Sequence, residues 1–215
     1  MVRRRSKTAP GPPRFAGLDP GKEGYICVVD ERCRIRAMWA LPYLENRIDY
    51  VALEKLFRAM KVANVRLLFL EEAHAFPREA PNYAFTNGAG YGAICMALAI
   101  SKISYEVKKA EQWKRDAGIP VPKVTKAVLP PKPSTKAALK KWNAECKKVR
   151  DKRSRVVKKR RKDLSRAKAQ ALQPGYDFRI SPRAKTPHDG KCEAFLLARE
   201  AWKQARRIRD DHGHY

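Results

Sequence analysis

The chain has 215 residues, 44% of them hydrophobic, and a formal net charge of +26. This length and apolar content exclude wholesale disorder and allow one domain with a full core, or one domain plus an excursion. No stretch approaches the roughly 20 consecutive apolar residues that a membrane span requires, and the charge predicts a polyanionic partner, with nucleic acid the first choice.

The cysteines and the amino terminus bear on the cellular compartment. The five cysteines are scattered and form no C-x-x-C pair, which favours reduced thiols in a cytosol-like compartment over a zinc site or a disulfide framework. Residues 1–13 are basic and contain prolines but no apolar core, so we interpret them as a flexible basic arm and not as a secretory signal.

Residues 14–30 predict two short buried strands joined by a turn. The first strand ends at Asp19, and Pro20-Gly21 turns the chain into a second apolar run at 25–29. A lone ionised carboxylate at the rim of a sheet core is costly unless a cation meets it, which favours a metal ion or a metal-bound phosphate at Asp19. The alternative is a simple hairpin turn in which Asp19 bonds its own backbone.

Strands and helices then alternate along the chain. Residues 33–41 show the alternation of an edge strand, and Asp49 is placed to cap a helix. The nearly continuous apolar run at 65–70 predicts a central strand parallel to an earlier one, and it ends at Glu71-Glu72. Further expected elements are a loop at 73–82, a helix at 83–101, a strand at 103–107 and a short helix at 110–117. Gly88, Gly90 and Gly92 permit close backbone approach to DNA, to a second subunit or to the sheet, and we favour packing over ligand contact.

A strongly basic segment follows. Residues 118–135 hold five of the fifteen prolines and resemble a linker, and residues 136–172 have a helical pattern with only a thin apolar stripe. Between 123 and 168 there are nineteen Lys or Arg against three acidic residues, so +16 of the +26 lies here. A solvated helix pair, a partly disordered excursion and a duplex-binding surface are all compatible with this pattern.

Four carboxylates fall at the ends of expected elements. Asp19 and Glu71 follow strands, whereas Asp189 and Glu193 lie four residues apart at the start of the last helix, which we place from 188–189 to 209. A set of oxygen ligands without histidine or cysteine favours magnesium or manganese over zinc, and two such ions can clamp a phosphodiester. Helix-capping and surface charges near the helix dipole are the alternative for the last two.

Three motifs contain these four acids. They are Gly17-Leu18-Asp19-Pro20-Gly21, Leu70-Glu71-Glu72-Ala73-His74-Ala75-Phe76-Pro77 with Gly90-Tyr91-Gly92, and His188-Asp189-Gly190-Lys191-Cys192-Glu193-Ala194. They resemble the RuvC-type Holliday junction resolvases of the RNase H-like superfamily, the second and third motifs most closely those of the phage and chloroplast branches. This resemblance implies an α/β fold, with a mixed five-stranded sheet flanked by helices over about residues 14–117 and 160–205 and a basic helical insertion before the last helix.

The same resemblance implies a catalytic site and its partners. It implies a homodimer that nicks opposed strands of a four-way DNA junction, with two Mg²⁺ ions per subunit for which Mn²⁺ can substitute. Glu71 is preferred to Glu72 because the motif places its acid six residues before the proline, here Pro77. Phe76 is a junction wedge or a loop anchor. The implied metal ligands are Asp19, Glu71, Asp189 (the weakest match) and Glu193; the implied catalytic lysine is Lys162; and the implied DNA contacts are Phe76, Lys114, Arg160, Arg161, Lys162, Arg166 and Lys185.

The chain is therefore expected to be a magnesium-dependent, structure-selective endodeoxyribonuclease in the cytoplasm of a bacterial or phage-infected cell rather than in an organelle. A less selective flap or fork nuclease of the same fold remains an alternative. So does a non-catalytic basic DNA-binding or packaging protein, which explains the charge but not the placement of the acids. The expected divisions are a basic arm at 1–13, a single nuclease domain at 14–117 and 159–209, the linker and insertion at 118–158, and a tail at 210–215.

Overall fold

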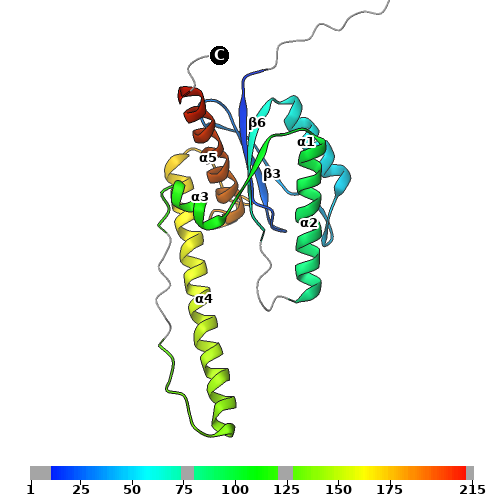
Figure 1. Cartoon of the computed structure of the whole chain (residues 1–215). Helices are drawn as coiled ribbons and strands as arrows, with labels where there is room; N and C mark the ends of the chain where they lie inside the picture. Colours follow the sequence, from blue (N-terminus) through cyan, green and yellow to red (C-terminus); the bar gives the residue numbers. More distant parts are fainter. Residues whose placement is uncertain (1–10, 74–79, 121–127, 212–215) are drawn as a thin grey trace, which may run out of the picture.

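The computed structural model describes residues 11–73, 80–120 and 128–211 of the chain (Figure 1). Phe76, most of the expected amino-terminal arm and residues 212–215 of the expected tail lie outside the described residues. The strands are β1 (Arg14–Leu18), β2 (Tyr25–Val29), β3 (Ile35–Ala40), β4 (Tyr43–Leu44), β5 (Arg47–Ile48), β6 (Val65–Glu71) and β7 (Tyr105–Lys108). The helices are α1 (Tyr50–Val62), α2 (Pro81–Ile100), α3 (Ala110–Asp116), α4 (Lys136–Leu172) and α5 (Asp189–Asp211).

The main sheet has five strands in the order β3-β2-β1-β6-β7. β1 pairs antiparallel with β2 and parallel with β6, and β7 continues the parallel side. This confirms the predicted fold class, with β3 at one edge and β6 parallel to an earlier strand. The two-residue strands β4 and β5 form a separate ribbon that was not predicted, because a run of two residues carries no readable periodicity.

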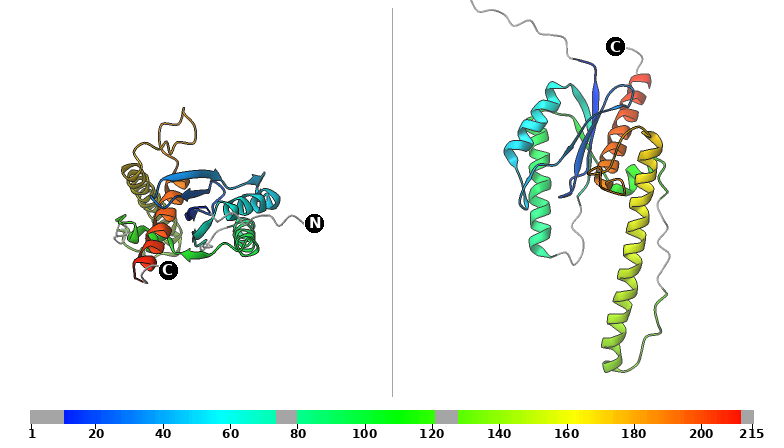
Figure 2. Two further views of the ribbon diagram at one scale, coloured as in Figure 1. Left: turned by 90° about the horizontal axis from the view of Figure 1, so that it is seen from above. Right: turned by 180° about the vertical axis from the view of Figure 1, so that it is seen from behind.

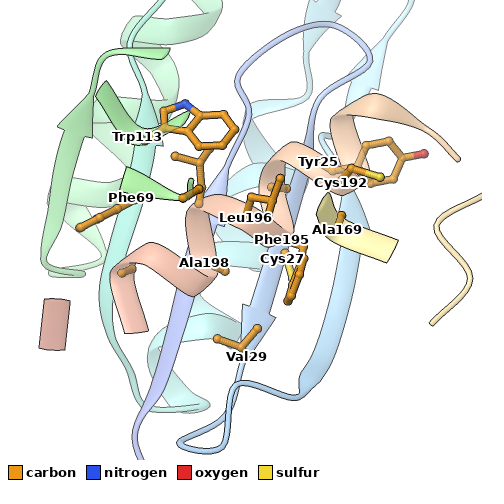
Figure 3. Close-up of a cluster of buried hydrophobic side chains, with 14 of the residues drawn as sticks. Tyr25, Cys27, Val29, Phe69, Trp113, Ala169, Cys192, Phe195, Leu196 and Ala198 are labelled. Atoms are coloured by element: carbon orange, nitrogen blue, oxygen red, sulfur yellow. The ribbon is translucent and has the colours of Figure 1, made fainter. Parts of the chain in front are cut away.

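Helices cover both faces of the sheet and divide the core into two clusters. α1 and α2 lie on one face and α5 on the other, with α3 and the carboxyl-terminal part of α4 beside α5 (Figures 1 and 2). Successive residues of a strand point to opposite faces, so Ala16 and Leu18 join the cluster under α1 and α2 whereas Phe15 joins the one under α5. Figure 3 shows the second cluster, in which Phe195 and Leu196 of α5 pack near Cys27 of β2.

Local signals position the first helix as expected. Asp49 is the N-cap residue of α1, and its carboxylate accepts hydrogen bonds from the backbone N–H groups of Val51 and Ala52, both at 3.0 Å. These bonds satisfy donors that have no partner within the helix. Leu53, Phe57 and Met60 follow at helical spacing and are buried against the sheet.

Gly17 sets how closely α5 can approach the sheet. A Cβ atom at this position would lie 2.2 Å from the backbone nitrogen of Ala198 and 2.3 Å from the carbonyl oxygen of Ala194. Both atoms belong to the α5 backbone, so no side-chain rotation could relieve the clash. The absence of a side chain at residue 17 therefore fixes the distance between β1 and the helix that carries Asp189 and Glu193.

Gly17→Ala is expected to destabilise the protein by about 2 kcal/mol or more, since the added methyl group forces α5 away from β1. Gly88→Ala is the matched control, because a Cβ at residue 88 of α2 meets nothing within 4 Å and alanine favours the helix by up to about 1 kcal/mol. Urea unfolding of both variants measures the difference. Equal midpoints for the two variants would contradict the close-packing argument.

One of the three clustered glycines of α2 packs closely within the chain. A Cβ at Gly90 would lie 3.4 Å from Cδ1 of Ile48. For Gly88 and Gly92, a Cβ would meet no atom of the described residues within 4 Å, so packing within the described chain does not account for them. Among the described residues, no helix has the length and apolar character to cross a membrane.

α4 is one uninterrupted helix of 37 residues. It extends far beyond the edge of the sheet, and only its carboxyl-terminal part lies beside α5 (Figures 1 and 2). The expectation of a helical segment is confirmed, but the segment is a single helix and not a helix pair. Because α4 passes through residue 158 without a break, the helix belongs both to the expected insertion and to the expected nuclease domain.

Candidate active site

The strand register brings Asp19 and Glu71 to the same edge of the sheet. β1 and β6 are parallel neighbours in which Leu18 is paired with Leu70. Asp19 follows Leu18 directly, and Glu71 is the last residue of β6. The carboxyl ends of parallel strands are where open α/β sheets place their binding sites, so two residues 52 positions apart in the sequence meet at one functional edge.

α5 contributes its first turns to the same place. A Cβ at Gly190 would lie 3.3 Å from Oδ2 of Asp19 and 2.7 Å from the carbonyl oxygen of Glu23, so the helix begins directly against the turn after β1. Asp189 precedes this glycine, and Glu193 lies one turn further on. The close approach permitted by Gly17 and Gly190 therefore places the start of α5 against Asp19, and the charge of Glu193 acts on the Asp19 carboxyl group.

The carboxyl group of Asp19 is strongly perturbed. Burial raises its pKa, the negative charges of Glu71 and Glu193 raise it further, and the result is a pKa of about 8 instead of 3.8. The backbone N–H of Gly21, at 3.4 Å from Oδ1, and the ammonium of Lys114 act in the opposite direction. Burial combined with nearby charged groups that shift a carboxyl pKa this far is typical of functional sites.

Lys114 is the cation of this pocket. Its Nζ atom lies 2.8 Å from Oε1 of Glu193, and both side chains are largely buried. Burial alone would lower the pKa of Lys114, but the charges of Glu193 and Glu71 outweigh burial and raise it. The same oxygen of Glu193 accepts a hydrogen bond of 3.0 Å from the hydroxyl of Ser165, a buried residue of α4.

Trp113 orients the second carboxylate. Its indole N–H donates a hydrogen bond of 2.8 Å to Oε2 of Glu71, and the ring is fully buried in the core cluster under α5. Neither Trp113 nor Ser165 was predicted to support the site. The position of Trp113 next to Lys114 in a short helix was the sequence signal that could have identified Trp113. Ser165 had no such signal, because its role depends on how α4 packs against α5.

Asp189 is held by basic side chains of α4. Lys162 forms an ion pair with Oδ2 of Asp189, and Arg166 lies 3.6 Å from Oδ1. Burial raises the pKa of Asp189, but the hydrogen bond and charge of Lys162, with the charge of Arg166, lower it overall. Asp189 therefore differs from Asp19, because its negative charge is already neutralised by protein groups.

The other expected DNA contacts lie in α4 and on the loop before α5. Arg161 lies 3.6 Å from a carboxylate oxygen of Glu111 in α3. Arg160 and Lys185 are exposed, the latter on the loop before α5. Among the described side chains, the buried Nε atoms of Arg161 and Arg166 have no hydrogen-bond partner, so each carries a donor suited to a phosphate oxygen.

Whether these carboxylates suit a divalent ion can be tested against their chemistry and their charge. Oxygen ligands without His or Cys are what Mg²⁺ and Mn²⁺ prefer, and burial together with the charges of Glu71 and Glu193 raises the pKa of Asp19, which a bound cation would counteract. As arranged here, no three acidic, histidine or cysteine residues of the described ranges lie close enough to coordinate one ion. The donor set suits such an ion in composition and charge, with the ammonium of Lys114 on Glu193 in place of a metal.

No protein-family model and no curated protein matches this sequence. Two solved structures of RuvC from Thermus thermophilus share its architecture. The RuvC complex with a Holliday junction substrate matches with a TM-score of 0.54 and 12% identity, over 90% of this chain and 95% of RuvC. A second RuvC structure gives a TM-score of 0.51 and 11% identity over 91% and 96% of the two chains. The chain thus has the RuvC-like, RNase H-like fold.

Proposed function

We propose that this protein is a magnesium-dependent endonuclease that cuts branched DNA, with four-way junctions as its principal substrate. The observation that carries the proposal is the Asp19 pocket, where the ends of β1 and β6 and the start of α5 meet, and where burial together with the charges of Glu71 and Glu193 raises the pKa of Asp19 to about 8. A non-catalytic DNA-binding protein gains nothing from an acidic cluster beside its basic surface, because uncompensated carboxylates repel phosphates.

In this proposal, Asp19, Glu71 and Glu193 would hold the divalent ions, and Asp189 would add a further ligand if Lys162 and Arg166 bound the DNA instead. When bound, Mg²⁺ would supply an activated water molecule and stabilise charge on the attacking and leaving oxygens. The remaining work falls to the protein. Trp113 keeps the Glu71 carboxylate in one orientation, and Ser165 does the same for Glu193.

Basic side chains around the acids would bind the scissile phosphate. Lys162 and Arg166 are already beside Asp189, and the unsatisfied Nε donors of Arg161 and Arg166 face a region that is largely shielded from water. Charge-assisted hydrogen bonds to phosphate are stronger there than at an exposed surface. A phosphate group drawn to these residues would release Asp189 from its ion pairs, which links substrate binding to completion of the ligand set.

A homodimer completes the proposal, since resolving a junction requires two opposed nicks. α2 supports it: none of its twenty residues is charged, and Phe85, Met96 and Ile100 are 78%, 65% and 68% exposed. α1 and α2 also enclose an apolar groove of about 540 Å³ that Tyr50 and Met96 line. Apolar surface of this extent on a protein with no membrane-spanning helix in its described part is typical of a protein interface.

The test is cleavage of a synthetic four-way junction by the purified full chain. Mg²⁺ or Mn²⁺ is expected to give paired nicks placed symmetrically about the branch point, whereas Ca²⁺ or EDTA gives binding without cleavage. A flap and a linear duplex of the same sequence are the matched substrates, and we expect both to be cut at least about tenfold more slowly.

Each other result identifies an alternative. Equal rates on junction, flap and duplex would indicate a less selective nuclease of the same fold. Single, uncoordinated nicks would contradict the homodimer. Tight DNA binding without cleavage under any of the metal conditions would indicate a basic DNA-binding protein and overturn the proposal.

A further inference from the structure

The outer part of α4 carries a dense basic surface. From Lys136 to Arg160 the helix holds twelve Lys or Arg and two acidic residues, and eleven of the twelve basic side chains are exposed. With a rise of 1.5 Å per residue, this part is about 37 Å long. Like charges this close repel one another and destabilise an isolated helix, so an anionic partner would stabilise the segment.

The opposite side of the helix is already occupied. Cys146 of α4 is 2% exposed, and the indole N–H of Trp142 donates a hydrogen bond of 2.8 Å to the carbonyl oxygen of Pro130. The hydrogen bond of Trp142 ties α4 to the segment that precedes it. Lys140, Lys147 and Lys158, by contrast, are exposed and accessible to another molecule.

Basic side chains of the outer part of α4 lie along the same line of the helix surface as residues that contact Glu193 and Asp189. Eighteen residues make about five full turns of an α-helix, so Lys147 lies on the same line of the helix surface as Ser165, which bonds Glu193. Lys140 and Lys158 are also eighteen residues apart and lie close to this line. Lys148 and Arg166, which contacts Asp189, are likewise eighteen residues apart. Asp151 is the one acidic residue of α4 near the line of Lys147.

We infer that this line, made of Lys140, Lys147 and Lys158, binds one duplex arm of the DNA as it leaves the active site. The inference rests on the proposed function for the position of the branch point, but its evidence is the charge and the helical phase of α4. Double-stranded DNA fits because its phosphates form a long regular array of negative charge, and the exposed length of α4 is close to the roughly 34–36 Å of one duplex turn. Binding is through phosphates and is independent of base sequence.

The experiment compares two triple variants of the full chain that lose the same charge. Lys140→Gln, Lys147→Gln and Lys158→Gln remove the α4 line, whereas Lys55→Gln, Arg66→Gln and Lys102→Gln remove three exposed charges elsewhere on the domain. Binding is measured with Ca²⁺ in place of Mg²⁺ on junctions whose arms extend from about 5 to about 15 base pairs. Circular dichroism checks that the variants keep their helix content.

The wild type is expected to bind more tightly as the arms grow by about one turn, and the α4 variant is expected to lose most of this gain. On long arms, the affinity of the α4 variant is expected to fall by roughly ten- to a hundredfold at about 0.1 M salt. The negative slope of log affinity against log salt is expected to become shallower by about 3. The control triple variant keeps the arm-length dependence of the wild type.

Three outcomes would overturn the inference: equal losses of affinity in the two triple variants, an unchanged salt slope in the α4 variant, or tighter binding of the full chain to an RNA duplex than to a DNA duplex of the same length. The inference and the proposed function fail separately. A chain that never cleaves DNA but shows the α4-dependent gain with arm length refutes only the nuclease, whereas normal cleavage without that gain refutes only the role of α4.

Discussion

Asp19→Asn is expected to lower the rate of junction cleavage by about a thousandfold or more while junction affinity stays equal or becomes tighter. The amide keeps the size of the carboxylate but removes the charge that lies at the centre of the cluster with Glu71 and Glu193. Loss of metal-based stabilisation costs several kcal/mol of transition-state free energy, and each 1.36 kcal/mol is a factor of ten in rate. Removing a negative charge also favours phosphate binding.

The matched control for this variant is Asp116→Asn at the exposed carboxyl end of α3, which is expected to cleave like the wild type. Single-turnover cleavage measures the rate, and calorimetric titration with Mn²⁺ measures ion binding directly. Glu71→Gln and Glu193→Gln should resemble Asp19→Asn, with a smaller effect for Asp189→Asn because Lys162 and Arg166 already neutralise that residue. Cleavage by Asp19→Asn within about threefold of the wild type would refute the assignment of metal ligands.

The second large effect is a pH dependence of stability in the metal-free protein. Burial and the charges of Glu71 and Glu193 raise the pKa of Asp19 from 3.8 to about 8. The folded chain therefore binds more protons than the unfolded chain between about pH 4 and pH 8, and stability falls as the pH rises through this range. In EDTA, Asp19→Asn is expected to flatten this decline and to be more stable than the wild type by about 3 kcal/mol at pH 8.5.

Asp30 provides a control of opposite sign. Burial raises the pKa of Asp30, but hydrogen bonds from Arg34 and Arg32, together with the charge of Arg34, lower it overall. Asp30→Asn should therefore destabilise the protein near neutral pH, and the loss should shrink as the pH falls towards the acid range where Asp30 itself gains a proton. Urea unfolding from about pH 3 to pH 8.5 measures both variants. A wild-type stability that rises between pH 5 and pH 8.5, unchanged by Asp19→Asn, would contradict the acidic cluster around Asp19.

The sequence predicts those parts of the fold that depend on local patterns. The alternation at 33–41, the cap at Asp49 and the apolar run at 65–70 each have a short-range physical cause, and the corresponding elements are present. Tyr43–Leu44 and Arg47–Ile48 are too short to show a period. The thin apolar stripe of 136–172 left a helix pair, a disordered excursion and a duplex-binding surface open, because the contact of Trp142 with the preceding segment depends on tertiary structure.

The candidate site shows the same division. The sequence places carboxylates at the ends of elements, and the parallel pairing of β1 with β6 explains why Asp19 and Glu71 then meet. It does not show which cation each carboxylate has as its partner. The pairing of Lys114 with Glu193 and of Lys162 with Asp189 follows from how α3 and α4 pack against α5, and packing between elements far apart in the chain leaves no local pattern.

The hydrogen bond from Trp113 to Glu71 gives the protein an internal optical sensor. Indole fluorescence depends on the acceptor of its N–H and on nearby charge, and this indole is fully buried 2.8 Å from a carboxylate of the acidic pocket. Any ion or phosphate that moves Glu71 therefore alters the emission of Trp113. The chain has four tryptophans, and Trp142 and Trp202 donate to the backbone carbonyls of Pro130 and Glu31 instead. The difference in fluorescence between the wild type and Trp113→Phe is therefore the signal of the pocket. This difference allows occupancy of the pocket to be followed in real time, without labels.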